Sequence, residues 1–215
     1  YSHLSSADEK NALDPRSNTQ LQKKKFKELL QQLNINSDQN IKIHLANSAG
    51  MLLGKDFHFD MVRLGLSIYG YDPLSNLREK LYLSPSLFLK AKVAFIRTIE
   101  KGVGVSYGSK FVTSRKTKLA VLSIGYADGI LRSLSGKINV IHNHQFYPQV
   151  GSITMDQMMV DITDSIDIKI GSTMILLGSE GEKKVSPTDW AIKSNTIPWE
   201  ILCSFKNRLP RVQVD

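Results

Sequence analysis

The hydrophobic pattern of this chain changes near residue 80, and this change limits the folds that it can adopt. Before it, a helical pattern at residues 17–35 precedes two apolar runs at residues 41–46 and 61–69, which we expect to be buried strands. Strands that alternate with helices indicate a parallel sheet, packed as a doubly wound sheet or a barrel. These few strands and helices cannot close a barrel and would leave an open sheet edge. We therefore expect the chain to be the C-terminal portion of a longer protein.

After the change, short apolar runs rich in β-branched residues replace the helical pattern. Turn residues such as Gly102 and Pro148 separate these runs, which indicates a compact, mainly antiparallel β domain. A helix is expected near its end, because Ser186 and Pro187 suit the N-cap and the first helical position. The boundary near residues 82–85 has no flexible linker. The expected strands occupy residues 88–99, 118–124, 137–141, 158–162 and 173–177.

The chain of 215 residues has a net charge of +8, which is compatible with an anionic partner. Four lysines, however, share the helical segment 17–35 with apolar residues at the spacing of one helix face. They form either the solvated side of that helix, which is the simpler interpretation, or an anion-binding patch. No zinc-ligand spacing, aromatic RNA-binding pattern or helix-turn-helix signature accompanies them. We therefore expect neither a nucleic acid nor a metal as a partner.

Membrane and secretion signals are absent from the sequence. No uninterrupted apolar stretch reaches the roughly 18 residues of a spanning helix, because Ser84, Pro85 and lysines interrupt the best candidate. Cys203 is the single cysteine, so an internal disulfide is excluded. The sequence begins at Tyr1 without a basic-then-apolar leader. We expect a cytoplasmic protein without a membrane partner, processed or cut from a larger one.

In the first half, polar residues lie at the ends of the expected strands. Arg63 interrupts an apolar run, where an unpaired guanidinium would be strongly unfavourable. It must therefore meet a salt-bridge partner or face a cofactor ring or an anion. Ser48 can offer its hydroxyl to a phosphate at a helix start, and Gly65 lets a backbone amide approach the same anion. Taken alone, each of these residues is more often structural.

In the second half, three short motifs place polar or aromatic residues at strand ends. Turns require glycine and aspartate in any case, so each motif alone favours a turn. Their joint occurrence indicates a site. The motifs are Ser106-Tyr107-Gly108, Gly125-Tyr126-Ala127-Asp128-Gly129 and Met155-Asp156-Gln157.

Taken together and in this order, the motifs of the chain resemble those of the alanine racemase family. The resemblance implies the C-terminal part of an eight-stranded α/β barrel at residues 1–83, which binds the cofactor. It implies a β domain at residues 84–215, which contributes to the active site of the partner subunit in a head-to-tail homodimer. The cofactor that it implies is pyridoxal 5′-phosphate. The other motifs that carry the resemblance are His3, His44-Leu45-Ala46-Asn47-Ser48, Arg63-Leu64-Gly65, Tyr69-Gly70 and Arg208-Leu209-Pro210-Arg211.

The resemblance assigns Tyr107 as the catalytic base on one face of the substrate. A tyrosine with a reference pKa of about 10 is a poor base at neutral pH unless cations or hydrogen bonds favour its phenolate. His3, His44 and Arg63 match the hydrogen-bonded chain of the family behind that tyrosine. Arg63 also matches the residue that faces the pyridine nitrogen of the cofactor. Because arginine keeps its proton, it leaves that nitrogen unprotonated and favours racemisation over transamination.

The resemblance also assigns binding residues. The backbone N–H of Met155 matches the group that receives the substrate carboxylate, and Tyr126 matches an entrance tyrosine near it. Trp199 stands where the family usually has a tyrosine that touches the cofactor phosphate, so cofactor affinity or substrate size preference is expected to differ. The residues that match the phosphate cradle are Ser48, Gly65 and Leu66.

The implied function is the interconversion of L-alanine and D-alanine through a pyridoxal phosphate aldimine, which supplies D-alanine for peptidoglycan. The lysine that forms the aldimine has no counterpart in this chain, so we expect the chain alone to be inactive. Two alternatives stay open: a broader-specificity amino-acid racemase or decarboxylase of the same fold, and a non-catalytic paralogue. A lysine-bearing barrel strand encoded upstream of Tyr1 would favour the enzymes, and its absence would favour the paralogue.

Overall fold

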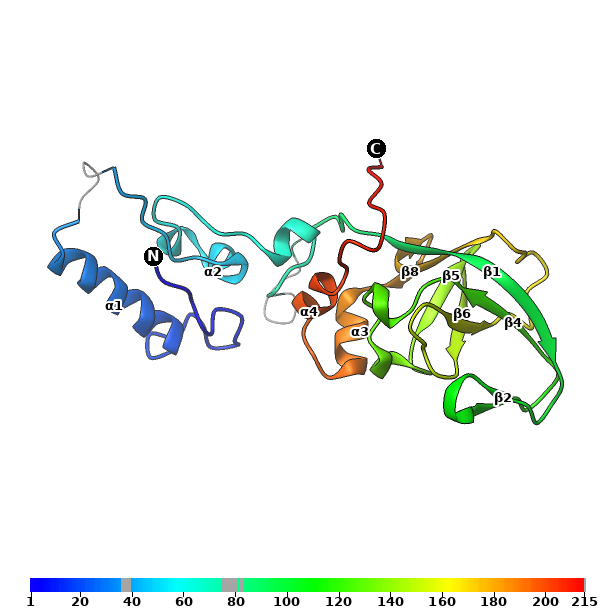
Figure 1. Cartoon of the computed structure of the whole chain (residues 1–215). Helices are drawn as coiled ribbons and strands as arrows, with labels where there is room; N and C mark the ends of the chain where they lie inside the picture. Colours follow the sequence, from blue (N-terminus) through cyan, green and yellow to red (C-terminus); the bar gives the residue numbers. More distant parts are fainter. Residues whose placement is uncertain (36–39, 75–80, 82, 215) are drawn as a thin grey trace. The chain divides into compact units, whose positions relative to one another are not determined.

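The computed structural model describes residues 1–35, 40–74, 81 and 83–214. The chain divides into two compact units, Tyr1–Ser86 and Leu87–Asp215 (Figure 1). Each unit has a hydrophobic core of its own. Tyr82, in the expected boundary segment, lies outside the described residues. The assignment of separate roles to residues 1–83 and 84–215 stays a prediction.

The first unit contains a long helix, α1 (Asn18–Gln32), and a short one, α2 (Ser48–Leu53). The helix predicted at residues 17–35 is confirmed, and the Ser17 hydroxyl caps it by accepting a hydrogen bond from the Gln20 N–H at 3.2 Å. Phe26 packs into the core of the unit, because it lies on the buried side of α1. The other core residues are Leu4, Ala7, Leu45, Ala46, Ala49, Phe57 and Leu74.

The two apolar runs predicted as strands form almost no ladder. They meet at one isolated parallel bridge, between His44 and Met61, so the strand prediction for both runs is wrong in the described part of the chain. The second run turns at Gly65 (φ −122°, ψ −90°) into a 3₁₀ helix, η3 (Leu66–Tyr69). A run of apolar residues joins a sheet only where neighbouring strands offer hydrogen bonds, and periodicity does not reveal such neighbours.

The second unit contains a seven-stranded sheet in which every adjacent pair is antiparallel, as predicted. Its strands are β1 (Leu89–Ile99), β4 (Thr117–Leu122), β5 (Asn139–His142), β6 (Gln145–Val150), β7 (Met158–Asp161), β8 (Thr173–Glu180) and β9 (Lys183–Val185). Their order is β1-β4-β7-β6-β5-β8-β9, and β1 also pairs with β8. This additional pairing closes the sheet into a ring, with β9 attached outside it.

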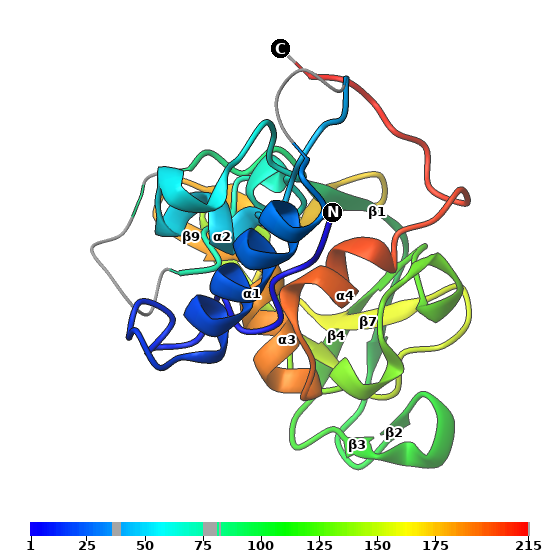
Figure 2. The same ribbon diagram turned by 90° about the vertical axis from the view of Figure 1, so that its left-hand side faces the viewer.

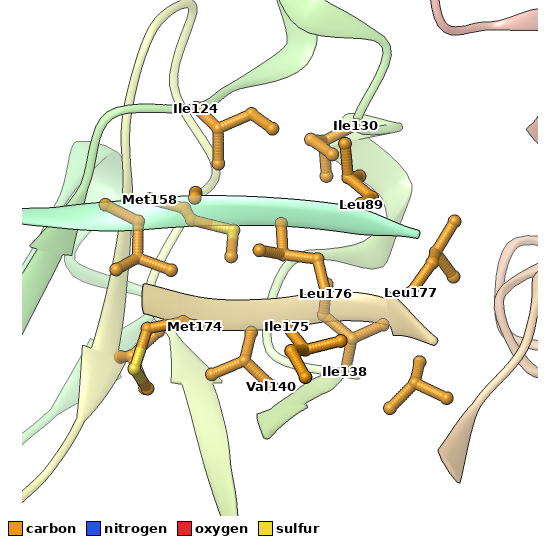
Figure 3. Packing of buried hydrophobic residues seen from close by; sticks show 14 of the residues in the cluster. Leu89, Ile124, Ile130, Ile138, Val140, Met158, Met174, Ile175, Leu176 and Leu177 are labelled. Atoms are coloured by element: carbon orange, nitrogen blue, oxygen red, sulfur yellow. The ribbon is translucent and has the colours of Figure 1, made fainter. Parts of the chain in front are cut away.

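Strand β1 closes the ring because it is long enough to reach two neighbours. Residues 89–92 pair with β8 and residues 93–99 pair with β4. The core lies against these strands, where side chains from strands and connecting segments pack together (Figure 3). Closure also removes the open backbone edges that a flat sheet would expose. Buried members of this core include Leu89, Ile124, Val140, Met158 and Leu176.

Strand β6 was not among the predicted strands, because Pro148 favoured a turn there. Pro148 instead lies inside β6, opposite Asn139 of β5. A proline removes a backbone donor, so it fits where no neighbouring strand needs that donor; the pairing of β6 with β7 begins only at Gln149. Two further strands, β2 (Gly104–Val105) and β3 (Phe111–Val112), form a separate two-stranded hairpin (Figure 2). Its Val105 packs with Leu119 of β4 and Val150 of β6.

Two helices, α3 (Pro187–Ser194) and α4 (Pro198–Cys203), follow the last strand. The predicted cap of α3 is confirmed: the Ser186 hydroxyl accepts from the Asp189 N–H at 3.2 Å, and the Asp189 carboxylate accepts from the Ser186 N–H at 2.7 Å. Trp190 is fully buried and anchors α3. None of the helices that the structure describes is long and apolar enough to cross a membrane.

Candidate active site

Arg63 is the centre of a cluster in the first unit. Its Nη2 donates to the Ser2 carbonyl at 2.8 Å and lies 3.3 Å from His3 Nδ1, and its Nη1 contacts His44 Nδ1. Its guanidinium also lies 5.3 Å from the ring centroid of Tyr1, within the range of a cation–π interaction. No ion pair between described residues includes Arg63. The salt-bridge interpretation is therefore not supported, and the positive charge is held by a carbonyl, imidazoles and an aromatic face.

His44 accepts a hydrogen bond from Arg63, as the Ser2 carbonyl does. Its ring stacks on Tyr1 with the centroids 5.1 Å apart and the planes 2° from parallel. Partial burial and the neighbouring guanidinium of Arg63 lower the pKa of His44 below its ordinary value. A neutral imidazole has one acceptor nitrogen, and arginine only donates, so Nδ1 accepts and Nε2 carries the proton. His44 thus orients Arg63 without neutralising it.

Ser48 joins the start of α2 to the start of η3. Its hydroxyl oxygen accepts from the Gly65 N–H at 2.9 Å and contacts the Ser67 N–H at 3.4 Å. The preceding residue, Asn47, caps α2 by accepting from the Gly50 N–H at 2.9 Å. Two helix starts therefore meet at one serine that is 4% exposed. Helix starts present N–H groups and favour anions.

The donors left over at this junction fit a phosphate group. Within the described residues, no acceptor is found for the Ser48 hydroxyl proton or for the Leu66 N–H. A Cβ added at Gly65 would meet no atom within 4 Å, so the space above this glycine is open. The Ser67 hydroxyl is buried and lacks a partner in the described part of the chain. Ser48, Gly65 and Leu66 can thus serve as the predicted cradle.

Tyr107 lies in the second unit, on the 3₁₀ turn η4 (Tyr107–Ser109) that joins β2 to β3. It is 72% exposed, although it is a large aromatic residue. No described residue hydrogen-bonds its phenol oxygen. The phenol is therefore available to a group from outside this unit, as a base that acts on a substrate must be.

Tyr126 and Met155 lie on two segments whose backbones touch. The Tyr126 N–H donates to the Thr154 carbonyl at 2.9 Å, and the Ala127 N–H donates to the Met155 carbonyl at 3.0 Å. Both side chains are exposed, Tyr126 by 42% and Met155 by 53%. The Met155 N–H has no acceptor among the residues that the structure describes, so it can receive a carboxylate.

Arg208 links these two segments, a role that the sequence reasoning missed. Its Nη2 lies 2.6 Å from Asp156 Oδ1 and its Nε lies 3.2 Å from Asp128 Oδ1. The second oxygen of the buried Asp128 accepts from the Gly125 N–H at 2.9 Å. All three charged residues stand in the sequence motifs, but only the folded chain shows that one arginine pairs with both carboxylates.

The described residues contain no group of three or more histidine, cysteine, aspartate or glutamate side chains that could hold a metal ion.

Comparison with protein-family models decides the family. Residues 1–73 match the model for the N-terminal domain of alanine racemase, and residues 86–213 match the model for its C-terminal domain. The chain belongs to the alanine racemase family. The resemblance read from the motifs is thereby confirmed.

Individual alanine racemases are similar to this chain along its whole length. The Prochlorococcus marinus enzyme is 52% identical over 214 residues and that of Nostoc sp. is 44% identical over 214 residues. These alignments include 100% of this chain but 55% and 54% of the relatives, so the chain spans about half the length of the curated relatives it matches.

Solved alanine racemase structures share the fold. The structure from Bartonella henselae, with covalently bound pyridoxal phosphate, has a TM-score of 0.83 at 35% identity and covers 99% of this chain and 55% of that one. The structure from Bacillus anthracis, with bound L-Ala-P, has a TM-score of 0.84 at 34% identity and covers 99% and 54%. The predicted fold class, part of a barrel followed by an antiparallel β domain, is confirmed.

The structure brings some of the predicted site residues together and leaves others apart. His3, His44 and Arg63 form one cluster, and Ser48 contacts Gly65. Tyr107, Tyr126 and Met155 belong to the second unit, on connected loops. Trp199 is partly buried in α4. Its contact with a phosphate stays a prediction, as do the catalytic and binding roles of the other residues.

Proposed function

We propose that this chain works in a pyridoxal-phosphate-dependent alanine racemase that interconverts L-alanine and D-alanine. The observation that carries the proposal is the Arg63 cluster, in which the Ser2 carbonyl and the imidazoles of His3 and His44 hold a guanidinium. The donors at Ser48 and Leu66 lie next to it in the chain, where Ser48 contacts Gly65. The names of the relatives, all alanine racemases, support it. The cytoplasm, where D-alanine is made for peptidoglycan, is the proposed location.

When bound, pyridoxal phosphate supplies a conjugated ring that stabilises the electron pair left by removal of the substrate α-proton. Ser48 and Leu66 would hold its phosphate through a hydroxyl and a backbone N–H. Arg63 would face the ring nitrogen. Because an arginine side chain only donates hydrogen bonds, Arg63, held in place by His44, would leave the ring nitrogen without a proton, which would disfavour transamination.

Tyr107 would move the α-proton on one face of the substrate, while the Met155 N–H holds the substrate carboxylate. We propose that these residues, with Tyr126, complete the active site of a second subunit in a homodimer. The exposure of all three in a single chain supports this arrangement. The lysine that holds the cofactor and the base for the opposite face would come from the part of such an enzyme that this chain does not span.

The activity is tested on the complete protein encoded by the reading frame that contains this chain. We expect it to racemise alanine only when loaded with pyridoxal phosphate, as followed by chiral chromatography, and to prefer alanine to serine and lysine. A higher kcat/KM for serine or lysine would favour the broader-specificity racemase, with Trp199 as the first residue to examine. Failure both to bind pyridoxal phosphate and to racemise any of the three would establish a non-catalytic paralogue.

Replacing Ser48 with alanine is expected to weaken pyridoxal phosphate binding about 10- to 100-fold, because a hydrogen bond to a charged group contributes about 1.5–3 kcal/mol. The measurement is equilibrium dialysis of the apoprotein with pyridoxal phosphate. The matched ligand is pyridoxal, which lacks the phosphate and whose affinity should change little. The matched variant is Ser86→Ala, whose hydroxyl donates to the Ile68 carbonyl at 3.1 Å. An equal loss for both ligands would contradict the assignment of Ser48 to the phosphate.

A further inference from the structure

Two serine hydroxyls connect the loop that carries Tyr107 to the loop that leads to Met155, each by a hydrogen bond to a backbone carbonyl of the other loop. The Ser106 hydroxyl donates to the Ser152 carbonyl at 2.7 Å. The Ser152 hydroxyl donates in the opposite direction, to the Tyr107 carbonyl at 2.9 Å. Each serine therefore fixes the backbone of the other loop, and the 46-residue separation between them makes this a tertiary contact.

The crossed pair holds a backbone conformation that Ser106 would not adopt by itself. Its φ of 64° and ψ of −174° lie in a region that is essentially restricted to glycine. On the opposite loop, Gly151 has φ +71°, and a Cβ there would lie 2.7 Å from the Val105 carbonyl oxygen. The two loops are thus in direct backbone contact. A strained residue persists where its surroundings over-determine it, and here the two hydroxyls supply the constraint.

The strain lies next to Tyr107, and the backbone of Ser106 sets the direction in which the tyrosine leaves the loop. Tyr107 is 72% exposed, so little packing within its own unit can fix its side chain. Ser152, in contrast, is 2% exposed and is a firm anchor. The position of the phenol therefore depends mainly on the backbone that the two serines hold.

The same loop continues to the group proposed to hold the substrate carboxylate. Residues 152–155 run from the Ser152 anchor to Met155, whose carbonyl accepts from the Ala127 N–H at 3.0 Å. A fixed distance between the base and the carboxylate site matters, because a misplacement of about 1 Å can reduce the rate about 100-fold. We propose that Ser106 and Ser152 are positioning residues that fix Tyr107 relative to Met155, an inference that rests on the proposed function.

The test compares Ser106→Ala, Ser152→Ala and the double variant in the complete holoenzyme. We expect kcat for alanine to fall about 10- to 100-fold while KM changes less than about threefold. The double variant should lose no more than the worse single variant, because either substitution already opens the crossed pair. The control is Ser194→Ala, which removes a partly buried hydroxyl that donates to the Trp190 carbonyl at 2.6 Å in α3, and should retain the wild-type kcat.

Ser106→Gly separates orientation from stability. Glycine adopts the observed backbone without strain, so this variant should unfold at a higher temperature than Ser106→Ala. It lacks the hydroxyl, so its kcat should be as low as that of Ser106→Ala. A Ser106→Gly enzyme with full activity would overturn the proposal, because the Ser106 hydroxyl would then not be needed to position Tyr107.

A second readout does not need catalysis. Amide hydrogen exchange of residues 106–109 should accelerate in Ser152→Ala while the exchange of β1 and β8 stays unchanged. If the wild-type protein is inactive but this local acceleration occurs, the proposed function fails and the loop constraint stands. If the wild-type protein is active and Ser152→Ala retains both its kcat and its exchange pattern, the positioning role is overturned.

Discussion

Replacing Tyr107 with phenylalanine is expected to lower kcat/KM for alanine about 10²- to 10⁴-fold, the range that a general base contributes. The substitution removes one oxygen from an exposed ring, so the fold should be unaffected. Because L-alanine and D-alanine have equal free energies, kcat/KM must fall by the same factor in both directions. Another quantity is therefore needed to show which enantiomer loses its α-proton to Tyr107.

The α-deuterium isotope effect supplies that quantity. With Tyr107→Phe, proton removal on one face becomes slower, so the isotope effect should increase for the enantiomer whose proton Tyr107 removes and much less for the other. Tyr147→Phe is the control, because Tyr147 is a partly buried residue packed against the β-domain core. Isotope effects that stay equal and small, or an unchanged kcat/KM, would remove Tyr107 from the mechanism.

Replacing Gly125 with alanine is expected to have the largest effect on stability. The backbone of Gly125 is extended (φ −149°, ψ −159°), so its conformation does not require glycine, but its surroundings do. An added Cβ would lie 2.3 Å from the Thr154 carbonyl oxygen and 2.4 Å from the Met155 carbonyl oxygen. Neither backbone atom can retreat without breaking the hydrogen bonds of Tyr126 and Ala127. We expect a loss of about 3 kcal/mol in the free energy of unfolding, the upper end for overpacking.

Denaturant unfolding of the complete protein measures this loss, and Gly136→Ala is its control. At Gly136 an added Cβ would meet no atom within 4 Å, but φ is +71°, so the control gives the penalty of a left-handed alanine alone, about 1–2 kcal/mol. Gly125→Ala should be the more damaging of the two and should also weaken alanine binding, because Tyr126 and Met155 move. A larger loss of stability in Gly136→Ala than in Gly125→Ala would show that the segments carrying Tyr126 and Met155 separate easily.

The sequence was sufficient for elements whose signals are local. Helix α1 followed from the 3.6-residue spacing and the Ser17 cap, and α3 followed from Ser186 and Pro187. Short apolar runs rich in β-branched residues, with turn residues between them, were enough to predict an antiparallel β domain. Strand β6 was missed because Pro148 resembles a turn residue, and η3 was missed because an apolar run does not reveal the turn at Gly65.

The site was predictable in its residues but not in its contacts. An arginine in an apolar run signals a need for partners, yet its partners at Ser2 and His3 are 61 and 60 residues away. The Ser2 partner is a backbone carbonyl, which every residue has. Ser106 and Ser152 likewise bond to carbonyls, so neither composition nor spacing distinguishes them from ordinary turn serines.

The pairing of β1 with β8, which closes the ring of strands, has a consequence during synthesis on the ribosome. Ala91 of β1 pairs with Met174 of β8, a contact between residues roughly 80 positions apart in the chain. At a translation rate of about 5–20 residues per second, the first part of β1 must wait several seconds for its partner strand to be made. During that interval its apolar face and backbone edge need protection, so we expect nascent chains that end before β8 to bind chaperones and longer ones to release them.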